Sequence, residues 1–465
     1  MIRIIGGGLA GTEAAWQVAR RGVPVRLHEM RPTRSTAVHR TDRLAELVCS
    51  NSFRGDKLEN AVGLLKEEMR QLNSLVMRVA DATRVPAGGA LAVDRERFAE
   101  EVTVALEAEP LIEIIREEVT SIPVSEGLTR PLIIATGPLT SEKLSSAVTA
   151  FVGRDQLYFF DAISPIVLAD SVNYEKVFRA SRRIRSKRTS MDSSGRAYAS
   201  DTEDGDYLNC PMSPENYRCF YDALSSAERA EVHDFDRTPF FEGCLPIEVM
   251  AHRGVDTLRF GPMKPVGLID PKTGQQPYAV VQLRQDNLAA DHFSLVGFQT
   301  QIKWSEQRRV LRLIPGLEEA EFVRLGMIHR NTYINAPTVL MPTWQTRNRP
   351  DVFFAGQLSG VEGYVESAAS GLMAGINAAA LVQGKEPLTF PRTTAMGALA
   401  HYVSHADPMN YQPTNIAYGL IPSLDEPVRG RQARRQALAR RALADLKVTG
   451  QVAEDRDGTI SAKIS

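Results

Sequence analysis

The stretch IRIIGGGLAGTEAAWQVARRGVPVRLHE, residues 2–29, decides the fold. Apolar residues 2–5 predict a buried strand, and the small and apolar side chains of residues 12–21 predict a helix. A turn at Gly22 then leads into a second predicted strand, residues 23–28. Between the first strand and the helix, glycines form a G-x-G-x-x-G sequence. Strand, glycine loop, helix and second strand together indicate a dinucleotide-binding βαβ unit.

The glycine positions match the contacts that a pyrophosphate requires. We expect Gly6 to make the tight turn, Gly8 to let the backbone approach the phosphates, and Gly11 to let the helix pack closely on the strand. The N-terminus of the helix would attract the anion. The alternative is a glycine turn with a structural role only. The loop that we expect to bind the cofactor consists of Gly6, Gly7, Gly8, Leu9, Ala10 and Gly11.

The residue that ends the second strand narrows the choice of nucleotide. Glu29 stands where an acidic side chain accepts hydrogen bonds from both hydroxyls of an adenosine ribose. A 2′-phosphate would be repelled there, so FAD or NAD is favoured over NADP.

Two later segments favour FAD over NAD. Residues 131–137 predict a buried strand that ends in the small-residue turn Thr136-Gly137, and residues 352–356 predict another that ends at Gly356. A helix rich in small residues, 365–380, follows the second of them, an arrangement typical of FAD proteins. Gln357 stands where many FAD domains have an acidic residue, but its amide can also bind a hydroxyl. A helix packed tightly on a sheet, without a cofactor, is the alternative.

The predicted fold class is α/β: a Rossmann-like FAD-binding domain, discontinuous in sequence, with an inserted smaller α+β domain. The chain has 465 residues, enough for two to three domains. We place the first part of the FAD domain at 1–169, the insertion at 170–290, and the second part, with a C-terminal basic helix, at 291–465. Residues 90–108 predict a turn and a packed helix, and residues 278–283 predict a strand.

Composition excludes several classes of protein. Hydrophobic residues make up 43% of the chain, which excludes disorder and coiled coil as the main architecture. No apolar run approaches about 18 residues, so we expect no membrane span. Residues 1–5 lead directly into the glycine cluster, so we expect no secretion signal. The four cysteines show neither redox-pair nor zinc-site spacing. We therefore expect a cytoplasmic protein without a metal.

Charge is balanced overall but uneven along the chain. There are 55 basic and 56 acidic residues, a net charge of −1. Residues 177–188 and 429–441 each hold six basic side chains and no acidic one. Such runs are usually solvated faces, yet two of them in a neutral chain favour a polyanion partner.

Two of the cysteines lie where a reactive thiol is plausible. Cys49 lies in a polar stretch soon after the adenosine-binding strand, and Cys244 lies between a glycine and a proline turn. Turn thiols near arginine can act as nucleophiles, although a buried packing role is the common alternative. For Cys210 and Cys219 we expect only packing.

Together these motifs resemble the folate- and FAD-dependent tRNA (uracil-5-)-methyltransferases of bacteria, from residue 4 to about residue 420. Gln357 fits the pattern of that family. The motifs that carry the resemblance are residues 6–11 with 29–32, CSNS at 49–52, DYLNCPM at 206–212, FEGCLPIE at 241–248, FGPMKPVGL at 260–268, QLRQ at 282–285, VGFQT at 296–300, HRNTY at 329–333, GQ at 356–357 and GVEGYVES at 360–367.

The resemblance implies methylation of C5 of the uridine at position 54, in the tRNA T loop. Methylenetetrahydrofolate would supply the carbon and reduced FAD the hydride, with NAD(P)H as reductant. Cys244 would attack C6 of the uracil, and Cys49 would lie by the flavin, trapping it covalently or aiding proton transfer. The other implied site residues are Glu362, Gly363 and Tyr364 for the cofactor, and Lys264, Arg284, His329 and Asn331 for folate and uracil.

The alternatives are a flavoenzyme that modifies another tRNA uridine, a small-molecule flavin oxidoreductase, and a tRNA-binding protein that holds FAD as a structural element. The extended basic segment 181–206 is a candidate for tRNA contact.

Overall fold

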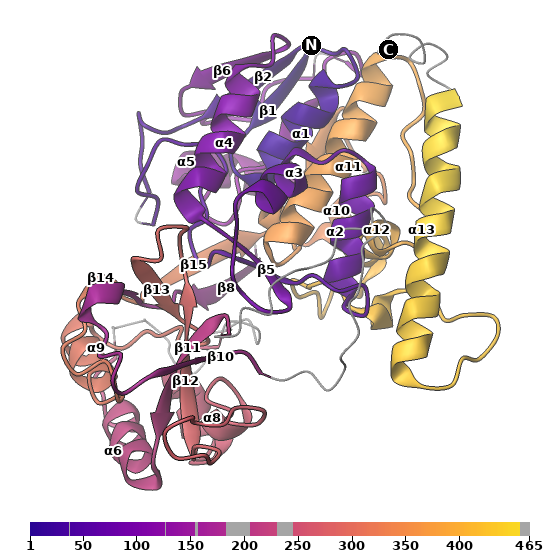
Figure 1. The fold of residues 1–465 in the computed structure, drawn as a ribbon. Helices are drawn as coiled ribbons and strands as arrows, with labels where there is room; N and C mark the ends of the chain where they lie inside the picture. Colours follow the sequence, from indigo (N-terminus) through magenta and orange to yellow (C-terminus); the bar gives the residue numbers. More distant parts are fainter. Residues whose placement is uncertain (37, 126, 154–156, 183–204, 230–244, 456–465) are drawn as a thin grey trace.

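The computed structural model describes residues 1–465 except 37, 126, 154–156, 183–204, 230–244 and 456–465, with the backbone alone at 157–161, 328–330 and 448–455. Two units make up the molecule (Figure 1). The larger holds both ends of the chain, and the smaller, built from the middle of the sequence, lies below it in that view.

A parallel sheet forms the centre of the larger unit. Its five strands follow the order β16-β7-β1-β2-β6, and every neighbouring pair is parallel. Because β16 comes from the C-terminal third of the chain and the other strands from the first, the unit is discontinuous in sequence, as predicted. The strands are β1 (Ile2–Ile5), β2 (Val25–Glu29), β6 (Ile112–Arg116), β7 (Leu132–Ile134) and β16 (Val352–Phe354).

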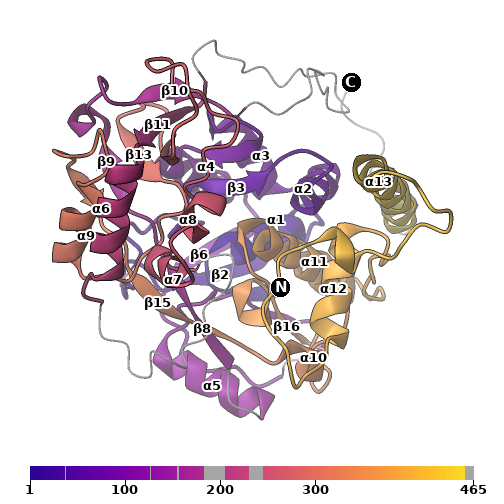
Figure 2. The same ribbon diagram turned by 90° about the horizontal axis from the view of Figure 1, so that it is seen from below.

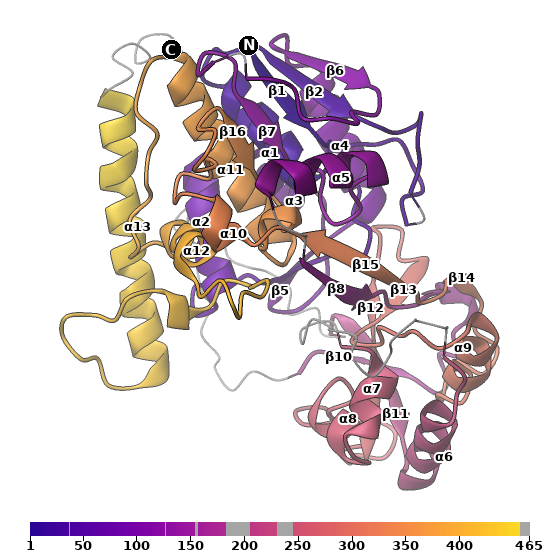
Figure 3. The ribbon, with the colours of Figure 1, turned by 180° about the vertical axis from the view of Figure 1, so that it is seen from behind.

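Two helices pack face to face beside this sheet (Figures 1 and 3). They are α1 (Leu9–Ala19) and α11 (Tyr364–Val382), both predicted. Their backbones touch at Gly371, where a Cβ atom would lie 2.0 Å from the carbonyl oxygen of Ala10. Among the described helices, α11 is the one long and apolar enough to cross a membrane, but 78% of that stretch is buried inside the protein, as in a core helix.

A small sheet, β3-β5-β4, and several helices complete the larger unit. The prediction for residues 90–108 was partly wrong: 90–93 form strand β5, because they pair with residues on both sides. The predicted helix follows it. The elements are β3 (Ser52–Gly55), β4 (Arg84–Val85), β5 (Ala90–Val93), α2 (Ala61–Gln71), α3 (Leu75–Ala82), α4 (Arg95–Glu107), α5 (Glu142–Val152), α10 (Ala336–Val339), α12 (Ala395–His405) and α13 (Arg431–Asp455).

The smaller unit contains a six-stranded sheet of order β10-β11-β12-β13-β9-β14, in which each neighbouring pair is antiparallel. Figure 2 shows α6 and α9 together beside this sheet. The elements are β9 (Ile166–Leu168), β10 (Phe178–Ala180), β11 (Tyr207–Met212), β12 (Ala279–Gln285), β13 (His292–Leu295), β14 (Phe322–Arg324), α6 (Pro214–Ser225), α7 (Ile247–His252), α8 (Thr257–Phe260) and α9 (Trp304–Leu311).

This sheet takes strands from outside residues 170–290. β9 precedes that range, and β13 and β14 follow it. They belong to this sheet because each is hydrogen-bonded to a neighbouring strand of it. We therefore propose that the inserted domain extends over about 163–326. A two-stranded ribbon, β8 (Leu157–Ala162) with β15 (Ile328–Tyr333), joins it to the larger unit.

Candidate functional site

A pocket lies where the carboxyl ends of the parallel strands meet. The glycine loop after β1, the turn after β7 and the turn after β16 form its walls, and about 1030 Å³ of space is free of protein atoms. This is the edge at which open α/β sheets bind nucleotides. Eleven of the fourteen residues predicted to bind the cofactor line the pocket: Gly6, Gly7, Gly8, Leu9, Ala10, Glu29, Thr136, Gly137, Gly356, Gln357 and Tyr364.

The glycine loop has the geometry that its sequence predicts. Gly6 has a φ of +105°, and Gly11 packs so closely that a Cβ atom there would lie 1.8 Å from the Gly6 carbonyl oxygen. A Cβ atom on Gly8 would meet no protein atom within 4 Å. Gly8 also precedes α1 without a side-chain cap, so the first N–H groups of the helix are available to an anion in the pocket.

Glu29 holds the glycine loop as well as lining the pocket. Its Oε2 accepts a hydrogen bond from the Gly7 N–H at 2.9 Å, and its Oε1 accepts from Nε of Arg31 at 2.8 Å. Burial opposes ionisation, but Arg31 and the N–H donors outweigh it and hold the pKa of Glu29 below its ordinary value. The carboxylate therefore stays charged. Oε1 also accepts from the Arg31 N–H at 3.0 Å, so Oε2 is the oxygen that keeps a lone pair for a further donor.

The third wall comes from the turn after β16 and the start of α11. Gln357 donates to Oε2 of Glu362 at 2.5 Å, so the buried Glu362 lies behind the wall and orients the amide that faces the pocket. Gly363 ends this turn with a φ of +104°. Neither Glu362 nor Gly363 lines the pocket.

The residues around the pocket fit a bound FAD. The cradle at Gly8 would be filled by any side chain, and a helix N-terminus opens onto it. Asn331 does not line this pocket. It is fully buried, and both polar atoms of its amide lack a hydrogen-bond partner among the described residues. Its neighbour Thr332 contacts the Pro138 carbonyl, at the wall of the pocket, through its N–H at 3.5 Å. An amide in this state is suited to a ligand with paired donors and acceptors.

Cys49 adjoins the pocket through Val48 and Tyr364, both of which line it. The hydroxyl oxygen of Tyr364 accepts from the N–H of Cys49 at 2.8 Å and from the N–H of Ser50 at 3.1 Å. Arg284, predicted to bind substrate, donates to Oδ1 of Asn51 at 3.0 Å and to Oγ of Ser50 at 2.9 Å. The fold thus brings Cys49, Tyr364 and Arg284 together from distant parts of the sequence.

The other predicted site residues are less closely grouped. Lys264 is exposed on the turn between α8 and β12 and does not line the pocket. His329 lies in the part of β15, residues 328–330, where only the backbone is described. Cys244 falls within residues 230–244, outside the described residues. Cys210 is buried, as expected, but Cys219 is exposed, because it lies on the outer face of α6, so the expectation that it packs was wrong.

Sequence reasoning missed the arginines that surround these residues. Arg31 pairs with Glu29 and with Glu46 at 3.0 Å, and Arg95 and Arg324 hold the segment around Cys49. The pairing of Glu29 with Arg31 could have been found from their spacing in the strand-end motif. The other contacts join residues 15 to 276 positions apart, and that of Arg324 crosses between the domains, so no local pattern reveals them.

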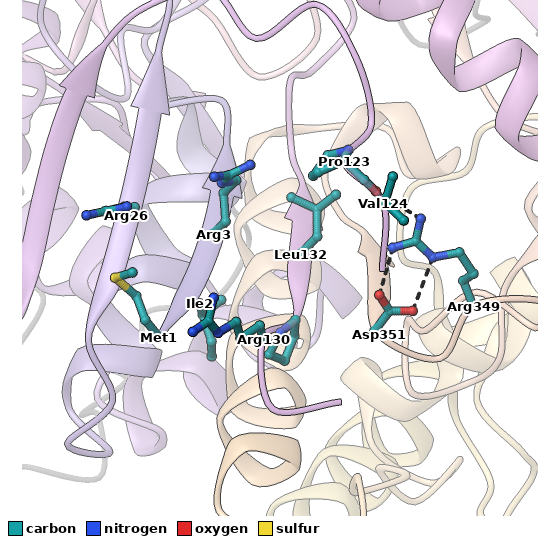
Figure 4. A pocket seen from close by; sticks show the side chains of 11 residues that line it. Met1, Ile2, Arg3, Arg26, Pro123, Val124, Arg130, Leu132, Arg349 and Asp351 are labelled. Atoms are coloured by element: carbon teal, nitrogen blue, oxygen red, sulfur yellow. Dashed lines mark hydrogen bonds and ion pairs between the residues drawn. The ribbon is translucent and has the colours of Figure 1, made fainter. Parts of the chain in front are cut away.

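A second pocket lies at the opposite, amino-terminal edge of the parallel sheet (Figure 4). Arg349 there donates to both oxygens of Asp351, at 3.2 and 2.7 Å, and Ser125 donates to the same carboxylate at 2.8 Å. These contacts tie the loop before β7 to the start of β16. Among the described residues, no group of three or more His, Cys, Asp or Glu side chains could hold a metal ion.

A parallel sheet with a glycine-lined pocket at the carboxyl ends of its strands defines a Rossmann-like, FAD-binding flavoprotein. The family model "Glucose inhibited division protein A" matches residues 1–386. The fold is similar to that of Aquifex aeolicus GidA, with a TM-score of 0.69 at 19% identity, over 97% of this chain and 73% of that one.

Full-length relatives carry a more specific name. A protein of Pelotomaculum thermopropionicum is 58% identical over 96% of this chain and 97% of its own length, and one of Enterococcus faecalis is 54% identical over 98% and 99%. Both are named methylenetetrahydrofolate–tRNA-(uracil-5-)-methyltransferase TrmFO. The chain therefore belongs to the GidA family and, within it, to the group of these folate-dependent tRNA methyltransferases.

Proposed function

We propose that this protein methylates C5 of uridine 54 in the tRNA T loop, with methylenetetrahydrofolate as carbon donor and reduced FAD as hydride donor. The observation that carries the proposal is the identity of 54–58% with folate-dependent tRNA (uracil-5-)-methyltransferases over 95–98% of the chain. As a member of this group the chain is an enzyme that methylates tRNA uracil. The position in the tRNA, the nucleophile and the reductant are the parts that experiment must test.

Uracil C5 does not attack a carbon electrophile until a nucleophile has added to C6. We assign this addition to the thiolate of Cys244, whose bond to C6 places electron density on C5. After methylation, loss of the C5 proton and of the thiolate restores the C5–C6 double bond. Bound FAD, in its reduced form, supplies the hydride that completes the methyl group. The uridine must leave the stacked T loop to reach the site.

The chain's own residues bind and orient the reactants in this scheme. The N-terminus of α1 and the backbone at Gly8 would hold the pyrophosphate, and Glu29 the ribose. Gln357 and Tyr364 would line the remainder of the cofactor site, with Cys49 beside the flavin. Arg284, His329, Asn331 and Lys264 are the proposed contacts to folate and uracil. NADH or NADPH is the proposed reductant, and the cytoplasm is the proposed location.

The proposed activity is tested by incubating the protein with unmodified tRNA, FAD, labelled methylenetetrahydrofolate and either NADH or NADPH. Labelled ribothymidine should appear at position 54 when the tRNA is digested and mapped. A tRNA with uridine 54 replaced by cytidine should take up no label. Label at another uridine would contradict the assigned position, and product made only with S-adenosylmethionine would contradict the carbon donor.

Cys244→Ala should abolish ribothymidine formation while leaving the FAD absorbance of the purified protein unchanged, because the thiol serves uracil and not the flavin. Cys219→Ala is the matched control, since Cys219 is an exposed cysteine elsewhere in the same domain. Near-normal turnover by Cys244→Ala would remove this residue from the nucleophile role.

A further inference from the structure

Three arginines converge on the five residues 47–51, which carry Cys49. Arg95, at the start of α4, donates to the Leu47 carbonyl at 2.6 Å, and Arg324, at the end of β14, donates to the Val48 carbonyl. Arg284, in β12, donates to the side chains of Ser50 and Asn51. We call Arg95, Arg284 and Arg324 the arginine cluster. Its contacts lie on both sides of Cys49 along the chain and come from both domains.

The described residues around the arginine cluster carry too little negative charge to neutralise it. Asp286 pairs with Arg95 at 3.1 Å. Within the described part of the chain, Arg284 and Arg324 have no carboxylate within ion-pair distance, although each is only 9% exposed. Burial lowers the pKa of both, to about 10 for Arg324, where repulsion from Arg95 adds to the effect. Buried charges without a counter-ion are costly, so an anion is expected beside them.

The segment itself offers that anion. Cys49 is partly exposed, next to Val48 and Tyr364, which line the cofactor pocket. Burial and the negative charge of a Cys49 thiolate both raise the pKa of Tyr364, so its hydroxyl stays protonated. A Cys49 thiolate would interact favourably with all three arginines, and the Tyr364 hydroxyl beside it is neutral. Against them stands a contact of 3.8 Å from Sγ to the Ala162 carbonyl oxygen, which suits a thiol but is long and weak.

We propose that the arginine cluster holds Cys49 as a thiolate at neutral pH, with Arg284 and Arg324 as positioning residues. The thiol proton passes to solvent, and no electrons are transferred. Cationic neighbours and partial exposure are the setting in which protein thiols ionise readily. The inference deepens the proposed function and rests on it, because a thiolate is required of Cys49 in either of its expected roles, attack on an electrophilic carbon or acceptance of a proton.

The test measures the ionisation of Cys49 without tRNA or folate, so it can fail or succeed independently of the methylation assay. The FAD-bound protein is treated with iodoacetamide from pH 5 to 10. Alkylation joins sulfur to carbon and releases iodide, and the peptide that contains residue 49 is quantified by mass spectrometry. The rate should reach half its maximum at least one pH unit below the ordinary thiol value of about 8.5. Thiolate absorbance near 240 nm, compared with Cys49→Ser, gives the same midpoint if FAD slows alkylation.

Arg284→Gln and Arg324→Gln should each shift the midpoint upward by a unit or more, and so slow alkylation at pH 6 by about tenfold, because the thiolate fraction falls tenfold per unit. Glutamine keeps a donor and removes the charge. Arg324→Lys restores the charge and should restore most of the rate. Arg97→Gln is the matched control: Arg97 lies on α4, like Arg95, but is 53% exposed and pairs with Glu101.

Unchanged FAD absorbance and melting temperature identify variants that have kept the fold. A wild-type midpoint at or above the ordinary thiol value would overturn the proposal. A low midpoint that neither glutamine variant shifts would also overturn the proposal, because groups other than Arg284 and Arg324 would then stabilise the thiolate.

Discussion

Two glycines of the same loop, Gly11 and Gly8, differ in what an added Cβ atom would contact. At Gly11 a Cβ atom would collide with the backbone oxygen of Gly6, and backbone cannot move aside as a flexible side chain can. At Gly8 the same atom would project into the cofactor pocket and meet no protein atom. We therefore expect Gly11 to matter for folding and Gly8 to matter for FAD binding.

Gly11→Ala should lower the free energy of unfolding of the FAD-free protein by about 1–3 kcal/mol, because helix and strand must separate. Gly8→Ala should change that quantity by less than about 1 kcal/mol, since its backbone angles suit any residue, yet weaken FAD binding at least about tenfold. Thermal unfolding without cofactor and fluorescence titration with FAD measure the two effects. If Gly8→Ala bound FAD as tightly as the wild type, the pyrophosphate could not lie at this loop.

At the scale of elements, one carboxylate joins a strand to a helix and to a second strand. Asp56, just after β3, contacts Lys66 at 3.4 Å and Arg70 at 3.2 Å on α2, and Arg84 at 2.7 Å on β4. Burial alone would raise the pKa of Asp56, but the three cations lower it to about 2. Lys66 is fully buried, and its pKa is lowered to about 8 mainly by burial, so it depends on this partner to stay charged.

Asp56→Asn should therefore lower the free energy of unfolding at pH 7 by roughly 2 kcal/mol. Because the folded-state pKa of about 2 lies below the ordinary 3.8, the contribution of Asp56 is complete above about pH 4 and is lost as the pH falls through the folded-state value. The difference between wild type and variant should thus shrink between pH 4 and pH 2. Denaturant unfolding at several pH values measures it.

Asp222→Asn is the control for this experiment. Asp222 also pairs with an arginine, at 3.1 Å, but its side chain is 56% exposed, and exposed pairs contribute little. Its effect should stay within about 0.5 kcal/mol at every pH. A difference for Asp56→Asn that did not depend on pH would show that its charge is not what matters.

On the scale of the whole molecule, positively charged side chains are concentrated on helix α13. Helix α13 lies along the side of the larger unit (Figure 1). Leu438, Ala442 and Leu446 on α13 are buried, while Arg431, Arg434 and Arg440 are exposed. Although the net charge of the chain is −1, helix α13 therefore presents a basic face. The other predicted basic run lies largely within residues 183–204, outside the described chain.

If α13 contacts tRNA phosphates, replacing Arg431, Arg434 and Arg440 with glutamine should weaken tRNA binding. The slope of log Kd against log salt should fall by up to about three, roughly one for each phosphate that an arginine no longer neutralises. Filter binding at several salt concentrations measures this, and FAD content should not change. Replacing the exposed Arg20, Arg97 and Arg130 instead makes the same change in net charge on other elements. Equal effects of the two sets would assign the result to net charge and exclude α13 as a contact.

The sequence by itself determined four strands of the parallel sheet, β1, β2, β7 and β16, together with the glycine loop and the helix after β16. Each is specified by local patterns: apolar runs, small residues where backbones touch, and an acid at the end of β2. These signals need no distant partner, which is why they could be predicted from residues 2–29, 131–137 and 352–380 alone.

Only the tertiary structure decided the bounds of the second sheet and the surroundings of Cys49. Strands β9, β13 and β14 join that sheet through hydrogen bonds to strands far away in the chain. Arg95, Arg284 and Arg324 meet residues 47–51 across gaps of up to 276 positions. Backbone pairing and buried charge depend on which segments become neighbours after folding, and no short stretch of sequence records that.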